Sequence, residues 1–101
     1  MIAVTEQTTI DQALAAAAQT WPDRPFLATP ANPARAYDPA GRELTYATVA
    51  AAVDALARRY RAAGYGVGHR VGLFLENRLE HVLHAFALNG LGVCCVPVNP
   101  D

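Results

Sequence analysis

A chain of 101 residues is long enough for one domain with a modest core, and its hydrophobic content of 52% is typical of a globular protein. Eight arginines and no lysine face nine carboxylates, and the formal net charge is −1. These charges are spread along the chain, so they give no electrostatic support to a nucleic-acid partner. No segment approaches the roughly 18 consecutive apolar residues of a transmembrane segment. Residues 1–10 contain no basic residue, which argues against a signal peptide.

The first predicted helix begins after Thr9, which can cap it, because Gln12 lies three residues on and can return a hydrogen bond. We expect this helix to end near Gln19, before Trp21 and Pro22. Its apolar face consists of Ile10, Leu14, Ala17 and Ala18.

Two short antiparallel strands are expected over residues 26–29 and 42–44. Residues 30–41 contain three prolines and predict an exposed proline-rich loop between these strands. Thr45 then caps a second helix, and Gly64 ends it as a left-handed cap. The apolar positions of this helix recur with helical period at Val49, Val53, Leu56, Ala57 and Tyr60.

Residues 70–75 and 93–98 are nearly unbroken apolar runs that predict two strands flanking a third helix. This spacing predicts a right-handed βαβ unit with parallel strands, and such strands are usually covered on both faces. The third helix should cover one face, and we expect the second helix to shield part of the other. Asn77 is the expected N-cap of the third helix, with Glu80 at the third helical position. Its inward stripe is Leu79, Val82, Leu83, Phe86 and Ala87, and Gly90 and Gly92 end it.

Two features have a superficial likeness to functional motifs. Residues 64–68 read G-x-G-x-G, but this turn follows a helix and enters a strand, whereas phosphate loops leave a strand and open a helix. His81 and His84 lie three residues apart with no third ligand nearby, which favours a solvated helix face over a metal site. His69 lies in the turn before a strand and has no partner that the sequence identifies.

Cys94 and Cys95 are adjacent in a predicted strand, where neighbouring side chains point to opposite faces. A structural thiol pair in a reducing cytosol is favoured over a disulfide, a redox pair or metal ligands. We therefore expect a cytoplasmic protein. We assign no catalytic, cofactor-binding or metal-binding residue to this chain.

Four short motifs resemble, in order and spacing, the start of the adenylate-forming enzyme superfamily. The family's first core motif is Leu-Thr-Tyr-x-Glu-Leu, which Leu44, Thr45 and Tyr46 match, while Thr48 and Val49 replace the Glu and Leu. The Thr48 replacement removes the reciprocal half of a capping box and leaves the threonine cap intact.

The other three motifs follow further along the chain. Residues 64–71 resemble Gly-Val-x-x-Gly-Asp-x-Val, with His69 in place of the acid. Residues 76–80 resemble an Asn-x-x-Glu helix start. Residues 92–100 match Gly-Ala-x-x-Val-Pro-[ILV]-[ND]-Pro, with Val93 for the alanine. Within the superfamily these residues are more similar to acyl-CoA ligases than to peptide-synthetase adenylation domains.

The resemblance implies an α/β chain in which residues 1–101 are one partial domain, the N-terminal part of the large adenylation domain. It implies ATP-dependent activation of a fatty or other carboxylic acid, with Mg²⁺ and coenzyme A, in the full-length enzyme. The family's phosphate loop, ribose-binding aspartate and catalytic lysine lie beyond Asp101. We therefore expect this chain alone to be inactive, to bind none of these cofactors, and to have the remainder of its own enzyme as partner.

Two alternatives remain open: a non-catalytic βαβ interaction module or remnant, and the start of a peptide-synthetase adenylation domain. The isolated chain is also expected to self-associate through exposed apolar strands, because one helix can cover only one face of the pair.

Overall fold

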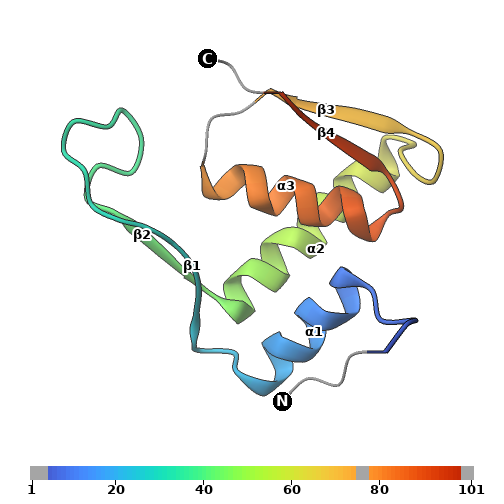
Figure 1. Ribbon diagram of the computed structural model, residues 1–101, viewed down its shortest axis with the longest axis horizontal. Helices are drawn as coiled ribbons and strands as arrows, with labels where there is room; N and C mark the ends of the chain where they lie inside the picture. The colour runs from blue at the N-terminus through green and yellow to red at the C-terminus, as the bar shows by residue number, and fades with distance from the viewer. Residues whose placement is uncertain (1–4, 75–77, 99–101) are drawn as a thin grey trace.

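The computed structural model describes residues 5–74 and 78–98. The elements in chain order are α1 (Ile10–Thr20), β1 (Pro25–Thr29), β2 (Arg42–Thr45), α2 (Tyr46–Ala62), β3 (Arg70–Phe74), α3 (Leu79–Gly90) and β4 (Cys94–Val98). The three helices contact one another, the β1–β2 hairpin projects to one side, and the β3–β4 pair lies along α3 (Figure 1). β1 pairs antiparallel with β2 and β3 pairs parallel with β4, which confirms the predicted α/β arrangement. No helix in this described part of the chain is long and apolar enough to cross a membrane.

Helices α1 and α2 begin directly after the N-cap residues that the sequence predicted, Thr9 and Thr45. Thr9 Oγ1 accepts a hydrogen bond from the Gln12 backbone N–H at 3.1 Å, and Gln12 Oε1 accepts one from the Thr9 N–H at 3.1 Å. Thr45 Oγ1 accepts from the Thr48 N–H at 3.2 Å. These hydrogen bonds satisfy N–H groups that have no acceptor within the helix, so both predicted caps are confirmed.

Glycine ends the second and third helices in the same way. Gly64 has a φ of +96°, the Tyr65 N–H donates to the Tyr60 carbonyl at 3.1 Å, and the Gly64 N–H donates to the Arg61 carbonyl at 3.0 Å. This is the Schellman arrangement, and an equivalent one follows α3, where Gly92 has a φ of +75°. The prediction that Gly64 is a left-handed cap is confirmed.

The start of α3 differs from the prediction. The helix begins at Leu79, with Arg78 in the N-cap position and no side-chain cap, so Glu80 is at the second helical position. The predicted cap, Asn77, lies outside the described residues. Arg78 has an extended backbone, with φ −107° and ψ 162°, and its guanidinium stacks on Tyr37. That contact comes from a distant loop, which the local capping pattern does not encode.

Two clusters of buried side chains form the core. The larger lies among the helices and the hairpin and consists of Leu14, Leu44, Val49, Val53, Leu79, Leu83 and Ala87. The smaller lies beneath the parallel strands and consists of Leu73, Leu88 and Val93. Tyr60 packs against both clusters, so it joins the two parts of the core. Ile10 was expected on the buried face of α1, but it is the first residue of the helix and is 51% exposed.

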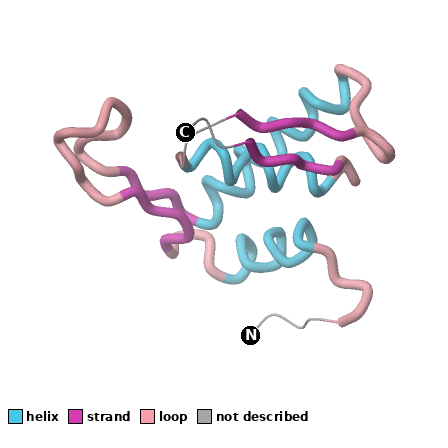
Figure 2. Tube along the Cα trace, turned by 45° about the horizontal axis from the view of Figure 1, so that its top comes forward, coloured by secondary structure: helices cyan, strands magenta, loops and turns pink. Residues whose placement is uncertain are grey.

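The β3–β4 pair has one covered face and one open face. Leu73 is buried against Leu88 and Val93, whereas Phe74 is 67% exposed and Val98 is 42% exposed. Tyr60 of α2 packs against the covered side, so α2 does not shield the opposite face, as we had expected it to. Figure 2 shows both strands beside the helical layer. Among the described residues, coverage on both faces is therefore not found. The open face consists of Arg70, Gly72, Phe74, Cys94, Val96 and Val98.

Candidate functional site

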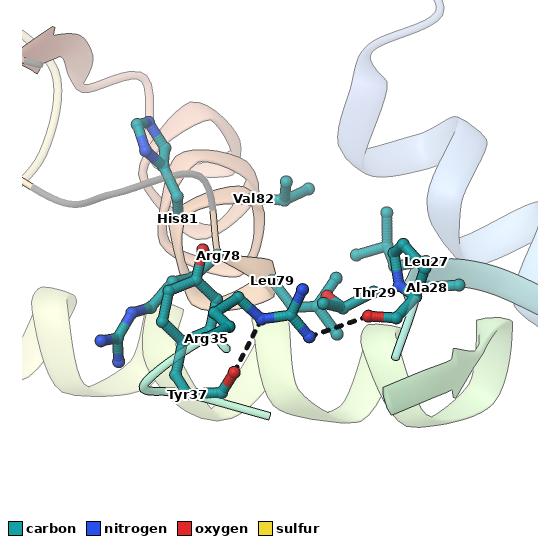
Figure 3. A pocket seen from close by; sticks show the side chains of 10 residues that line it. Leu27, Ala28, Thr29, Arg35, Tyr37, Arg78, Leu79, His81 and Val82 are labelled. Atoms are coloured by element: carbon teal, nitrogen blue, oxygen red, sulfur yellow. Dashed lines mark hydrogen bonds between the residues drawn. The ribbon is translucent and has the colours of Figure 1, made fainter. Parts of the chain in front are cut away.

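A pocket of about 460 Å³ lies between the hairpin and the start of α3 (Figure 3). The hairpin and its loop contribute Leu27, Ala28, Thr29, Pro30, Arg35 and Tyr37. The first turns of α3 contribute Arg78, Leu79, His81 and Val82. The lining therefore combines apolar side chains with two arginines, whose guanidinium groups lie on opposite sides of Tyr37.

Arg35 is held by the backbone of its own loop. Its Nε donates a hydrogen bond to the Tyr37 carbonyl at 2.7 Å, and its Nη2 donates to the carbonyls of Pro30, at 2.8 Å, and Asp38. Three backbone acceptors from separate positions fold the loop around one guanidinium. Because all three acceptors are uncharged, they orient the group without neutralising its charge.

Tyr37 connects this loop to α3. The Arg35 guanidinium carbon lies 5.1 Å from the centroid of the Tyr37 ring, and that of Arg78 lies 4.1 Å from it. Both distances are within the range of cation–π attraction. The ring therefore fixes two positive groups on the pocket wall and holds residues 30–41 against the start of α3.

An ion pair also joins the hairpin to α3, outside the pocket lining. Arg42 Nη1 hydrogen-bonds to Glu80 Oε1, and Asp38 Oδ2 lies 3.8 Å from the same nitrogen. The pKa of the Glu80 carboxyl is below its ordinary value, chiefly because the carboxylate accepts a hydrogen bond from the backbone of Glu80 itself. Burial opposes this shift, whereas the hydrogen bond and the positive charge of Arg42 add to it. The acid in the first turn of α3 is thus paired with Arg42.

The histidines differ from their predicted environments. His84 Nδ1 lies 2.7 Å from the Tyr60 hydroxyl, within hydrogen-bond distance. Burial raises the pKa of Tyr60, and the nearby Cys95 and Tyr65 raise it further. His81 and His84 are both half-buried, so the predicted solvated helix face is wrong for both. The reason is tertiary, because the hairpin covers the first turns of α3 and α2 covers its middle.

The glycine-rich turn is a helix stop and strand entry, as predicted. Gly64 and Gly68 have φ values of +96° and +92°. His69 Nδ1 accepts a hydrogen bond from the Gly66 N–H at 3.0 Å, and its ring contacts Tyr65 with centroids 5.6 Å apart. His69 therefore has a local structural partner that the sequence alone did not reveal.

The two cysteines are free, with Cys94 exposed and Cys95 half-buried. Burial raises the pKa of the Cys95 thiol, and the nearby Cys94 adds to the rise, which disfavours a reactive thiolate. Across residues 5–74 and 78–98, no group of three or more His, Cys, Asp or Glu side chains is placed to hold a metal ion.

Sequence reasoning missed the pocket formed by Arg35, Tyr37 and Arg78. The two arginines lie 43 positions apart, at residues 35 and 78, and no spacing rule connects them. The one local signal is an Arg-x-Tyr step inside a proline-rich loop, which is weak because such residues are common on exposed surfaces.

Comparison of the chain with known proteins identifies its family. The family model of the AMP-binding enzyme matches residues 14–101. Sulfoacetate–CoA ligase of Cupriavidus necator is 34% identical over 92 residues, which cover 91% of this chain and 16% of that protein. Acetoacetyl-CoA synthetase from Streptomyces lividans matches with a TM-score of 0.80 and 27% identity, over 92% of this chain and 14% of the other.

The fatty acid AMP ligase from Legionella pneumophila matches with a TM-score of 0.81 over 97% of this chain and 17% of the other, and its 18% identity shows likeness in fold alone. The chain thus spans 16% of the length of the curated relative that it matches. Because the family model covers most of the chain and the motifs occur in the expected order, the chain belongs to the AMP-binding, adenylate-forming enzyme family.

Proposed function

We propose that this chain is the N-terminal structural segment of an ATP-dependent carboxylic acid:CoA ligase. The supporting observation is that the AMP-binding family model matches residues 14–101, while the chain spans only 16% of a CoA ligase that is 34% identical to it. In this proposal the longer enzyme activates a carboxylic acid, fatty or otherwise, as an acyl-adenylate and transfers it to coenzyme A. The two free cysteines support a cytosolic location, where thiols stay reduced.

The glycine-rich turn of this segment does not fit the phosphate groups of the ATP and coenzyme A that the proposed reaction uses. The glycine-rich turn at residues 64–68 follows the C-terminal end of α2, where carbonyl groups and the negative end of the helix dipole repel phosphate. A phosphate site needs the opposite end, with free N–H groups. We therefore assign these cofactors to the rest of the enzyme and derive no catalytic step from this chain.

The role that we propose for the segment is to supply a packed layer of the larger fold. Beside Arg70, the open face of β3 and β4 carries the apolar side chains of Phe74, Val96 and Val98. Burial of apolar surface contributes about 25 cal/mol per Å², so covering this face would stabilise the protein by several kcal/mol. The remainder of the enzyme is the proposed partner for this face. In its absence a second copy of the chain takes that place.

Pyrophosphate exchange into ATP tests this function. The 101-residue chain is compared with the polypeptide encoded by the extended reading frame, using a panel of short, fatty and aromatic acids. We expect exchange and acyl-CoA formation from the longer polypeptide and none from the 101-residue chain. Exchange by the short chain that persists through repurification would overturn the proposal. A longer polypeptide that folds but lacks exchange would favour the non-catalytic module.

A further inference from the structure

A second pocket, of about 220 Å³, lies between α1 and a wall of aromatic rings, and we propose that it binds a small uncharged aromatic molecule. The ring wall consists of Phe26 of β1, Tyr46 of α2 and Phe86 of α3. This pocket shares no lining residue with the one that contains Arg35. The inference does not rest on the proposed ligase function, to which we assign no residue of this chain.

The ring wall is ordered by contacts between its own members. Phe26 stacks on Tyr46, with ring centroids 4.6 Å apart and an angle of 9° between the planes. Phe86 is nearly parallel to Phe26, with centroids 6.2 Å apart and an angle of 13°. The three rings come from three different elements, so tertiary packing holds them in place. A ligand therefore meets a preformed surface, which lowers the entropic cost of binding.

The opposite wall, on α1, leaves the space in front of the rings unfilled. Leu14 and Ala17 on this wall are buried, at 7% and 5% exposed, and Ala13 is half-buried. The short alanine side chains leave a cavity, and atoms beside a cavity lack partners for dispersion contacts. Ile10 lies in the same lining and is 51% exposed, so the pocket is open to solvent and a ligand can enter without unfolding of the chain.

The chemistry of the lining selects an uncharged ring. None of the residues that line this pocket is ionised at neutral pH, and the Tyr46 hydroxyl is the only polar side-chain group among them. A charged ligand would lose its hydration there without meeting an opposite charge. Because an apolar cavity of about 150 Å³ can hold benzene, this pocket has room for one ring with a small substituent. Aromatic ligands also gain from offset or edge contacts with aromatic side chains.

Fluorine NMR titration of the 101-residue chain with fluorobenzene and its charged analogue 4-fluorobenzoate tests this inference. We expect fluorobenzene to bind with a Kd of about 1 mM or tighter, and 4-fluorobenzoate to bind at least tenfold more weakly. Ala13→Leu should fill the pocket and weaken fluorobenzene binding at least tenfold, with unchanged circular dichroism. Ala51→Leu is the matched control, because it adds the same side chain at an exposed position of α2 outside the lining, and its affinity should equal that of the parent chain.

Nuclear Overhauser contacts locate the bound ring even if the chain self-associates or Ala13→Leu fails to fold. They should connect the fluorobenzene protons to the rings of Phe26 and Phe86 and to the Ala13 methyl group. Contacts to Phe74 on the open face of β3–β4, without contacts to Phe26 or Phe86, would overturn the proposal. So would equal affinity for 4-fluorobenzoate, a folded Ala13→Leu chain with an affinity within twofold of the parent, or no saturation by about 10 mM fluorobenzene.

Discussion

The two strand pairs of this molecule are stabilised in different ways. The β1–β2 hairpin is joined to the helices by specific polar and aromatic contacts, including Arg42 with Glu80 and the stack of Phe26 on Tyr46 at 4.6 Å. The β3–β4 pair is held by apolar packing on one face and leaves Phe74 67% exposed on the other. The hairpin therefore has its partners within the described chain, whereas the parallel pair has a face that no described residue covers.

The largest expected effect comes from truncating the α3 side chain that packs against the covered face of the parallel pair. Leu88 is 0% exposed, so Leu88→Ala should lower the free energy of unfolding by about 2–5 kcal/mol through lost burial and a residual cavity. Phe74→Ala on the open face is the matched control and, at concentrations where the chain is monomeric, should cost less than about 1 kcal/mol, because most of that side chain is then in water. Chemical denaturation measures both. Equal losses would contradict the one-sided covering of this pair.

The next effect concerns association through the open face. We expect the isolated chain to oligomerise, and the double variant Phe74→Ser, Val98→Thr to weaken association at least tenfold, or about 1.4 kcal/mol, because it removes apolar contact area. Light scattering and amide exchange measure this. A monodisperse parent chain with slowly exchanging amides in both strands would instead identify a self-sufficient domain and favour the interaction-module alternative.

A smaller effect lies where the hairpin passes into α2. Thr45→Ala removes the hydrogen bond to the Thr48 N–H and should cost about 1 kcal/mol in the free energy of unfolding. In the parent chain, Thr48→Glu should raise the free energy of unfolding by a few tenths of a kcal/mol, because it completes a capping box with Thr45. Thermal melts of the single and double variants check this. A clear loss of stability on Thr48→Glu would contradict a helix start at Thr45.

The smallest effect is the pH dependence of the contact between the hairpin and α3. The pKa of Glu80 is lower in the folded chain than its ordinary value of 4.5, so the unfolded chain binds the proton more readily. The stabilisation is complete above that ordinary value and is lost as pH falls through the lower, folded pKa. Because the Glu80 side chain is 41% exposed, solvent screening limits it to about 0.2–1 kcal/mol.

Melting curves of the parent chain and of Glu80→Gln between pH 7 and pH 2 measure this contribution. The difference between the two proteins should shrink as the pH falls. Arg42→Gln should remove only part of it, because the backbone hydrogen bond of Glu80 remains. A difference that grows on acidification would contradict the direction of the pKa shift.

The sequence by itself determined the order of the elements, two of the helix starts and the glycine ends. The two capping pairs, Thr9 with Gln12 and Thr45 with Thr48, are each three residues apart. The N–H of Gly64 donates a hydrogen bond to a carbonyl of the preceding turn. Signals of such short range can be read along the chain because the contacting atoms are neighbours in sequence. The family motifs were identified in the same way, from residues in order.

Only the tertiary structure decided which face of β3–β4 is covered and where the arginines meet. An unbroken apolar run has no alternation, so the inner side of Leu73 and the outer side of Phe74 could not be told apart until α2 and α3 had packed. Likewise, Arg42 reaches Glu80 across 38 positions, and Tyr37 brings Arg35 to the start of α3. These contacts depend on the relative placement of whole elements, which the packing of the core sets and no local spacing encodes.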